Sequence, residues 1–384
     1  MQMPPLIDSD VHHNWKSDAD IVAYLPKRWR EIVGGSNGAR GSLMPPTIWP
    51  PGQYGTNVRL DTFAEDGSRP GSDYPTLKRQ WLDPFNIRKA ILSFNIGLNG
   101  GLANPQLARE VVIAANNWNR DHWLSIDDDR IASVIMVSMQ EPEEAAKEIR
   151  RVAGHPKLVE VLLVANAIGR PFGHPIYHPI YEAAAEVGLP IGIHAGGDNG
   201  GMLQTAGGLP NSRLEMHVTL GQAMLHHAAS FITHGVFEKF PSLRLLLIEI
   251  GVSWAPWLIW SLDAMYPVLR QESIWVKRLP SEYFRQHIRM TTQPLEMSPK
   301  RDQLVNLLDA VEGIEDMLCF ASDYPHWDTD DPTFAARLLP DRWHAKLFYN
   351  NAAKLYGWPE LPAETFAPIA QPIAVPSIAA AVAK

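Results

Sequence analysis

The 384-residue sequence has a single cysteine, Cys319, which excludes both an intrachain disulfide framework and a cysteine-based zinc cluster. Fourteen histidines remain, so any metal must be held by histidine and carboxylate side chains. The sequence also lacks a run of about 18 apolar residues, and the N-terminus MQMPPLIDSD reaches acidic residues before an apolar stretch forms. We therefore expect a cytoplasmic protein without a targeting segment.

No tract of lysine or arginine occurs. The 34 Lys and Arg residues are outnumbered by 42 dispersed Asp and Glu residues, which gives a formal charge of −8. This balance argues against a nucleic-acid or anionic-membrane partner. Hydrophobic residues make up 46% of the chain and charged residues 20%, as in an ordinary globular protein with a sizeable core. The composition favours a small-molecule substrate as the partner.

Short apolar runs alternate with amphipathic stretches of helical length, which is typical of βα units. The runs predict eight strands, at residues 5–10, 89–95, 130–139, 158–166, 189–195, 243–250, 288–294 and 317–323. Helices are expected at residues 105–123, 141–153, 179–187, 213–240, 253–269 and 300–311. This order predicts an α/β fold of the (β/α)₈ TIM-barrel class, with functional groups at the C-terminal ends of the strands. A doubly wound open sheet is the alternative, but no glycine-rich fingerprint follows the first strand.

We predict one barrel domain over residues 1–357. An insertion at about residues 15–88 is rich in Pro, Gly and Trp, including MPPTIWPPGQYG, and is too long for a plain connection. We expect it to fold over the barrel mouth. Residues 358–384 are rich in Pro and Ala and cannot build a core, so we predict a C-terminal arm that is either disordered or extended over a neighbouring subunit.

Polar residues follow three of the predicted strands. Asp8, Asp10 and His12 are spaced by two, so their side chains are expected to project to the same side of the first strand. His194 follows the fifth apolar run, and Asp323 follows the eighth. Each has an ordinary explanation by itself, such as a solvated loop residue, a structural histidine or a helix N-cap. Because a closed barrel gathers its strand ends around one axis, together they predict a metal site.

Four segments carry a family resemblance: LIDSDVHH, GLPIGIHAGG, THGVFEKFPSLRLLLIEIG and FASDYPHWD. They resemble the amidohydrolase-related (amidohydrolase 2) family, which includes aminocarboxymuconate-semialdehyde decarboxylase and resorcylate-type decarboxylases. The resemblance spans about residues 5–357 and implies a barrel of the metal-dependent hydrolase type. It also implies that the ligands of one catalytic divalent metal are Asp10, His12, His194 and Asp323. Asp8 does not match a ligand position of the family.

The sequence departs from this family at the end of the sixth strand. The family usually has a histidine followed by glycines there as the acid/base, whereas this chain reads LIEIGVSW and has Glu249. The candidate catalytic residues are therefore Glu249, His234 and His326. His234 lies in THGVF, where many members have a small residue, so a second metal held by Glu249 and His234 is an alternative. His217, His226 and His227 are expected to be helix-surface or packing residues.

Two histidines and two aspartates suit Zn, Mn or Fe(II). A bound ion would polarise a bound oxygen or lower the pKa of bound water toward about 7, which serves either decarboxylation or hydrolysis of a small organic acid or amide. Glu249 or His326 would donate the proton in a decarboxylase, and Glu249 or His234 would transfer it in a hydrolase. Thr292 and Gln293 are predicted to contact the substrate. Arg213, Arg289 and Lys300 are further candidates for binding a substrate carboxylate.

Two other functions fit the same residues. A dinuclear iron or manganese oxygenase of the same superfamily would use Glu249 and His234 for the second ion. A metal-binding subunit without activity would pair with an active homologue through the long insertion and the tail. We accordingly expect a homo-oligomer, or a hetero-oligomer with a homologous subunit.

Overall fold

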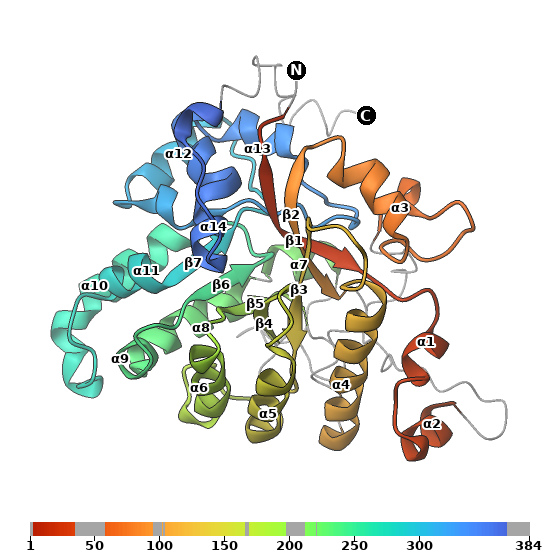
Figure 1. The fold of residues 1–384 in the computed structure, drawn as a ribbon. Coiled ribbons are helices and arrows are strands. Elements are labelled where there is room, and N and C mark those ends of the chain that lie inside the picture. The colour runs from red at the N-terminus through yellow and green to blue at the C-terminus, as the bar shows by residue number, and fades with distance from the viewer. Residues whose placement is uncertain are drawn as a thin grey trace.

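The computed structural model describes residues 3–34, 58–94, 102, 104–165, 169–196, 212–219 and 221–366 (Figure 1). Its eight strands are β1 Leu6–His13, β2 Ile87–Phe94, β3 Ile131–Met136, β4 Leu158–Val164, β5 Ile191–His194, β6 Leu245–Ile248, β7 Ile288–Thr291 and β8 Leu318–Cys319. They form one sheet in sequential order with every neighbouring pair parallel. All eight predicted strands are thus confirmed, and the fold is a nearly closed TIM barrel.

The barrel closes between its first and last strands. Ser9 N donates a hydrogen bond to the carbonyl oxygen of Phe320 (3.0 Å), and His12 N donates to that of Tyr324 (2.7 Å). Asp323 N donates to the carbonyl oxygen of Asp10 (3.1 Å). These bonds place the end of β1 directly beside the segment that follows β8, so residues more than 300 positions apart in the chain become neighbours.

The helices lie around the outside of the strands (Figure 1). Their bounds are α1 Asp18–Val22, α2 Lys27–Gly34, α3 Tyr74–Leu77, α4 Pro105–His122, α5 Pro142–Val152, α6 His178–Glu186, α7 Arg213–Thr219, α8 Gly221–Thr233, α9 Val236–Lys239, α10 Ala255–Leu269, α11 Pro280–His287, α12 Arg301–Asp309, α13 Pro332–Leu338 and α14 Asn351–Tyr356. Short 3₁₀ or π segments occur at Leu60–Thr62, Lys78–Leu82, Pro175–Tyr177, Arg270–Glu272, Ile314–Asp316, Asp341–Trp343, Lys346–Asn350 and Ala363–Thr365. None of the helices in these ranges is long and apolar enough to cross a lipid bilayer.

The prediction of one helix over residues 213–240 is wrong, because the stretch is divided into α7, α8 and α9. Gly235 separates α8 from α9 with a φ of +69°, a left-handed conformation that ends a helix. A Cβ atom at this position would lie 2.2 Å from the indole of Trp275. Glycine is therefore required here by both the backbone and the packing.

The strands are covered on both faces, by the barrel interior and by the helices. All six residues of β3 and all seven of β4 are buried. This explains why the strands read as continuous apolar runs rather than as an alternation of polar and apolar residues.

The described part of the insertion at 15–88 packs against the C-terminal ends of β1 and β8. Val58 forms an antiparallel bridge with His326, and Asn14 N donates to the carbonyl oxygen of Gly71 (2.8 Å). A Cβ atom at Gly71 would lie 2.5 Å from the carbonyl oxygen of His12. The segment MPPTIWPPGQYG lies outside the described residues, and of the predicted C-terminal arm only residues 358–366 are described.

Candidate metal centre

Six acidic and histidine side chains converge at the C-terminal edge of the barrel. One ligand atom from each of four residues, Asp10, His12, His194 and Glu249, lies within 4.8 Å of the others, and the same holds for the group His12, Asp323 and His326. The two groups share His12. Asp10, His12, His194 and Asp323 are each at most 2% exposed. The structure therefore brings together all four predicted ligands, with Glu249 and His326 beside them.

The distances between the ligand atoms suit one central cation. Nε2 of His12 lies 3.3 Å from Nε2 of His194 and 2.9 Å from Oδ1 of Asp323. Nε2 of His194 lies 3.2 Å from Oδ2 of Asp10. Two atoms that each lie about 2.1 Å from one ion are about 3.0 to 3.4 Å apart in octahedral or tetrahedral geometry. The cluster thus has the dimensions of a preformed mononuclear site.

Hydrogen bonds from Ser93 determine which nitrogen of His12 faces this centre. The Ser93 hydroxyl donates its proton to Oδ1 of Asp10 (2.7 Å), so toward Nδ1 of His12 (3.0 Å) it must act as the acceptor. Nδ1 of His12 then carries the hydrogen, and Nε2 presents a lone pair to the cluster. Burial lowers the pKa of His12 to about 4, which keeps the ring neutral near pH 7. This is the tautomer that a metal ligand requires.

The ring of His194 is oriented in the same way by a backbone carbonyl. Its Nδ1 lies 2.5 Å from the oxygen of Ala195, which can only accept a hydrogen bond. Burial lowers the pKa of His194, but the carboxylates of Asp10 and Glu249 together with its hydrogen bonds raise that pKa to about 9 in the metal-free protein. Metal binding would therefore displace the Nε2 proton.

The carboxylates of the cluster also fit a cation. Burial would raise the pKa of Asp10, but the charges of His12 and His194 and hydrogen bonds from His194 and Ser93 hold it below the ordinary range. Burial, and then the charge of Glu249, raise the pKa of Asp323 well above its ordinary value. Oδ1 of Asp323 is buried and has no partner in hydrogen-bond geometry within the described residues. A divalent ion would satisfy this oxygen and offset the repulsion among the carboxylates.

Two of these residues have a backbone conformation that is uncommon for side chains with a Cβ. Glu249 and Asp323 both have a φ of +61°. A left-handed non-glycine residue costs about 1–3 kcal/mol and persists only where its surroundings impose it. Glu249 N donates to Oγ1 of Thr291 (3.0 Å), and Asp323 N is held by the Asp10 carbonyl. The turns direct both carboxylates toward the barrel axis.

Glu296 fixes the loop after Glu249. Its carboxylate accepts hydrogen bonds from Val252 N (3.1 Å), Ser253 N (3.0 Å) and the Ser253 hydroxyl (2.8 Å). Gly251, with a φ of +66°, lies so close that a Cβ atom would be 2.4 Å from Oε1 of Glu296. Glu296 therefore holds the turn that places Glu249 in the cluster.

Asp8 does not share the orientation of Asp10 and His12, so the prediction that all three project to one side is wrong. The pairing of β1 with β2 shifts register between Asp8 and Val11, which indicates a bulge there. Asp8 instead accepts hydrogen bonds from Trp81 Nε1 (2.7 Å) and Ser322 N (2.9 Å). Burial raises the pKa of Asp8 to about 7. Its contacts are those of a residue that joins β1 to the insertion and to the segment after β8.

Gln293, one of the two predicted substrate contacts, lies against a ligand. Its Nε2 donates to Oδ2 of Asp323 (3.3 Å) and to Oδ2 of Asp328 (3.2 Å). Nε2 of His217 lies 3.3 Å from the same oxygen of Asp328. The interpretation of His217 as a helix-surface or packing residue missed this contact at the rim of the cluster. Thr292, the other predicted substrate contact, is buried, and its Oγ1 has no hydrogen-bond partner within the described ranges.

His326 lies beside the cluster as a predicted catalytic residue should. Its ring packs against that of His12 with centroids 4.3 Å apart, and its Nδ1 lies 2.5 Å from Oδ1 of Asp323. Its side chain is 13% exposed, against 0% for His12, so His326 lies on the outer side of the centre.

His234 is not part of the cluster, which corrects its assignment as a catalytic or second-metal residue. His227 on α8 lies at the C-terminal edge of the barrel, because its Nε2 lies 2.6 Å from the carbonyl oxygen of Ala165, which follows β4. His234 lies seven residues further along, about 10 Å at the rise of a helix, and is exposed near the ring of His174. The packing role predicted for His227 agrees with its burial.

Of the three candidates for a substrate carboxylate, Arg289 lies away from the site. Arg289 is the second residue of β7 and therefore lies at the opposite edge of the barrel from the cluster. Lys300 is exposed at the start of α12, and the side chain of Arg213 lies outside the described residues.

Comparison with known proteins shows the family of this chain. The chain matches the amidohydrolase family model over residues 7–358. It belongs to the amidohydrolase family.

The relatives include several decarboxylases. Gamma-resorcylate decarboxylase of Polaromonas sp. (strain JS666 / ATCC BAA-500) is 23% identical over 320 residues, covering 76% of this amidohydrolase and 92% of that protein. An amidohydrolase structure from Mycobacterium avium subsp. paratuberculosis K-10 has a TM-score of 0.68 and 22% identity, covering 93% of this chain and 99% of its own. A manganese-bound dihydroxybenzoic acid decarboxylase from Polaromonas sp. JS666 has a TM-score of 0.61 and 18% identity, covering 93% and 97%.

Sequence reasoning about this amidohydrolase missed Ser93, Asp328 and Glu296. Ser93 did leave a signal, because it is the polar residue in the apolar run KAILSFN and stands near the end of its strand. Glu296 and Asp328 lie in loops whose partners belong to other strands, so no local pattern marks them. Their contacts exist only because the barrel brings these loops together.

Proposed function

We propose that this amidohydrolase is a divalent-metal-dependent decarboxylase of a small aromatic acid that carries a hydroxyl group beside its carboxylate. The observation that carries the proposal is the buried cluster in which the Nε2 atoms of His12 and His194 lie beside the carboxylates of Asp323 and Asp10. The relatives named for decarboxylation of dihydroxybenzoic acids support the reaction class.

Four residues would hold the ion: Asp10, His12, His194 and Asp323. Their oxygen and imidazole donors suit Mn, Zn or Fe(II), and we propose manganese by analogy with the manganese-bound relative. When bound, the ion supplies a Lewis acid that binds the carboxylate or hydroxyl oxygen of the substrate. Ser93 and the Ala195 carbonyl keep both imidazoles in the required orientation.

We assign the proton transfer to Glu249. In decarboxylation the bond between the ring carbon and the carboxylate breaks, carbon dioxide leaves, and the electron pair on the ring carbon takes a proton. Glu249 stands at the end of β6, where the resemblance places the acid/base residue of the family. Its Oε2 lies 3.3 Å from Nε2 of His194, so it borders the cluster. The Thr291 and Glu296 contacts hold its turn in place, as proton transfer to a fixed atom requires.

The test is carbon dioxide release from a panel of hydroxybenzoates by the manganese-loaded protein. Asp323→Ala is expected to lose both bound metal and turnover, because it removes one of the four buried residues proposed to hold the ion. Asp8→Asn is the matched control, since Asp8 is also a buried aspartate but lies within β1 and outside the cluster; it should retain metal. Retention of both metal and turnover by Asp323→Ala would contradict the proposal.

A second variant tests the proton transfer. Glu249→Gln should retain metal and lose about 10²- to 10⁴-fold in kcat, the range for a general acid. Loss of metal from Glu249→Gln would identify Glu249 as a ligand and transfer the proton-donor role to His326. Release of product from an amide or ester panel, with no carbon dioxide from the acids, would favour the hydrolase alternative.

No observation favours the dinuclear oxygenase, because exposed His234 cannot join Glu249 around a second ion. The complete ligand cluster likewise does not favour a subunit without activity. Turnover of the chain alone under nitrogen would count against both alternatives.

A further inference from the structure

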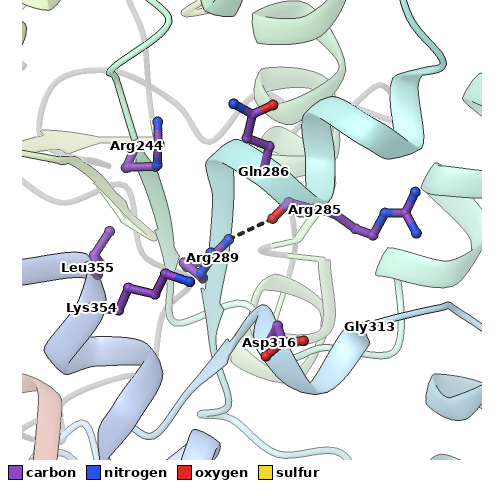
Figure 2. A pocket seen from close by; sticks show the side chains of 8 residues that line it. All are labelled: Arg244, Arg285, Gln286, Arg289, Gly313, Asp316, Lys354 and Leu355. Atoms are coloured by element: carbon purple, nitrogen blue, oxygen red, sulfur yellow. Dashed lines mark hydrogen bonds between the residues drawn. The ribbon is translucent and has the colours of Figure 1, made fainter. Parts of the chain in front are cut away.

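A cavity lined by several charged side chains lies at the opposite edge of the barrel from the candidate metal centre. It has a volume of about 380 Å³ and is lined by Arg244, Arg285, Arg289, Lys354 and Asp316, among others (Figure 2). Arg244 directly precedes β6, Arg289 is the second residue of β7, and Asp316 stands two residues before β8. The five residues from Arg244 to Glu249 span about 16 Å along the strand, so this cavity is separate from the cluster.

The lining of the cavity carries four cations and one carboxylate. The carboxylate of Asp316 is engaged by Lys346 (2.8 Å), and Arg285 pairs with Glu312 (2.5 Å). Within the described part of the chain, no carboxylate forms an ion pair with any of the other three cations, Arg244, Arg289 and Lys354. The nearby carboxylate of Asp316 offsets part of this charge by favouring the charged form of Arg289, and the cations of the lining still outnumber it.

Backbone carbonyls hold the two half-buried guanidinium groups in place. Nη1 of Arg289 donates to the carbonyl oxygens of Arg285 (3.0 Å, dashed in Figure 2) and Ile288 (2.8 Å). Nη1 of Arg244 donates to the carbonyl oxygens of three residues just before β6, at 2.9–3.2 Å. No hydrogen bond from Nε or Nη2 of either arginine reaches another described residue. Carbonyls orient the guanidinium groups but do not neutralise them.

The electrostatics of the cavity follow from this arrangement. Burial lowers the pKa of Arg244 and of Arg289, and the charge of Arg244 lowers that of Arg289 further. Both groups remain cationic at neutral pH. Two partly desolvated and fixed cations that repel each other form a preorganised site for an anion. In Figure 2 Lys354 extends from α14 toward Arg289 and can contribute a third charge.

We propose that this cavity binds a compact oxyanion, such as a phosphate or carboxylate group, at the N-terminal edge of the barrel. The guanidinium fork matches both chemistries through paired N–H donors. A volume of about 380 Å³ is at the small end of ligand sites, so the ligand is a free inorganic anion or a small organic acid. The ligand at this edge does not react at the metal centre and acts as a stabilising or regulatory anion.

The test is calorimetric titration of the full-length, metal-loaded protein after removal of free metal. Inorganic phosphate and sodium benzoate are titrated separately, at an ionic strength held constant with chloride. We expect saturable binding of at least one of them with a Kd below about 1 mM. Binding of phosphate but not of benzoate would identify the ligand as an inorganic anion. Binding of benzoate that Arg289→Met weakens would identify the ligand as an organic acid. Either result supports the site.

Two variants assign the binding to this cavity. Arg289→Met keeps the packing of the side-chain stem and should weaken binding at least about tenfold, because it removes a charged donor pair. Lys354→Gln changes an exposed residue, so it should fold normally, and we expect weakening of about threefold. Lys147→Gln on α5 removes an equal charge elsewhere and should change nothing. No saturable binding by the wild type, or equal binding by both cavity variants and the control, would overturn the proposal.

Discussion

Replacement of Ser93 by alanine should weaken metal binding without touching a metal ligand. The Ser93 hydroxyl is 2.7 Å from Oδ1 of Asp10 and 3.0 Å from Nδ1 of His12, so one side chain orients two of the four proposed ligands. Without it, His12 loses one of the hydrogen bonds that hold its ring and keeps the backbone hydrogen bond with Phe94. Asp10 loses a hydrogen bond to its charged carboxylate in a buried site, where water cannot replace it.

The magnitude follows from the kind of contact that is lost. Removal of a residue that orients a metal ligand typically lowers metal affinity about 10- to 100-fold. This corresponds to about 1.4–2.8 kcal/mol of binding free energy. The fold itself should tolerate the change, because the deleted atom is one buried hydroxyl oxygen and no backbone bond depends on it.

The assay is competition for manganese against a chelator of known affinity, with metal content measured by elemental analysis. Ser138→Ala is the matched control, since Ser138 is also a buried serine just beyond a strand, and its hydroxyl has no partner among the described residues. We expect an unchanged Kd for Ser138→Ala. A Kd for Ser93→Ala within about threefold of the wild type would refute the role of Ser93 in orienting His12 and Asp10.

Three further outcomes are expected. Burial raises the pKa of Glu160 from 4.5 to about 8, so its contribution to stability is present below pH 4.5 and is lost as the pH rises to about 8. In urea unfolding of metal-free protein, the free energy of unfolding of Glu160→Gln should therefore increase relative to that of the wild type as the pH rises, by up to about 5 kcal/mol. A difference between the two proteins that does not change with pH would contradict this. Gly251→Ala should lower stability by about 1–3 kcal/mol and reduce turnover through the displaced Glu296, whereas Gly67→Ala, also at positive φ but with open space, should cost less and leave turnover unchanged. Chelation of an ion present at 100 times its Kd should remove about 2.7 kcal/mol of stability, about 3 °C in Tm for a chain of this length, and an unchanged Tm would argue against a bound ion.

Local sequence was sufficient to predict the strands and the types of ligand at their ends. Every predicted strand is present, because a strand buried on both faces is an unbroken apolar run and is readable without its neighbours. Asp10, His12, His194 and Asp323 were identified because each follows such a run, and the family resemblance supported the same set. Their convergence required only that the barrel close.

Contacts between strands could not be predicted, because they depend on register and on backbone turns. At the bulge in β1 the carboxylate of Asp8 joins Trp81 and Ser322 and stays outside the cluster, although the spacing of two predicted that it would join Asp10. His234 was proposed from a departure from the family pattern and His217 was interpreted from its helical position, whereas the structure separates the first from the cluster and brings the second to Asp328. Gly235 and the length of α8 decide these positions, and neither effect is visible in a local pattern.

The sequence by itself thus determined a barrel with candidate histidine and carboxylate ligands at its C-terminal edge, because apolar periodicity and residue type are local properties. Only the tertiary structure decided that Ser93 orients two ligands, that Glu249 lies against His194, and that Arg244 and Arg289 share a cavity at the other edge. Other contacts of the cluster join residues as far as 311 positions apart, as with His12 and Asp323. Closure of the barrel brings them together, and that is a property of the whole chain.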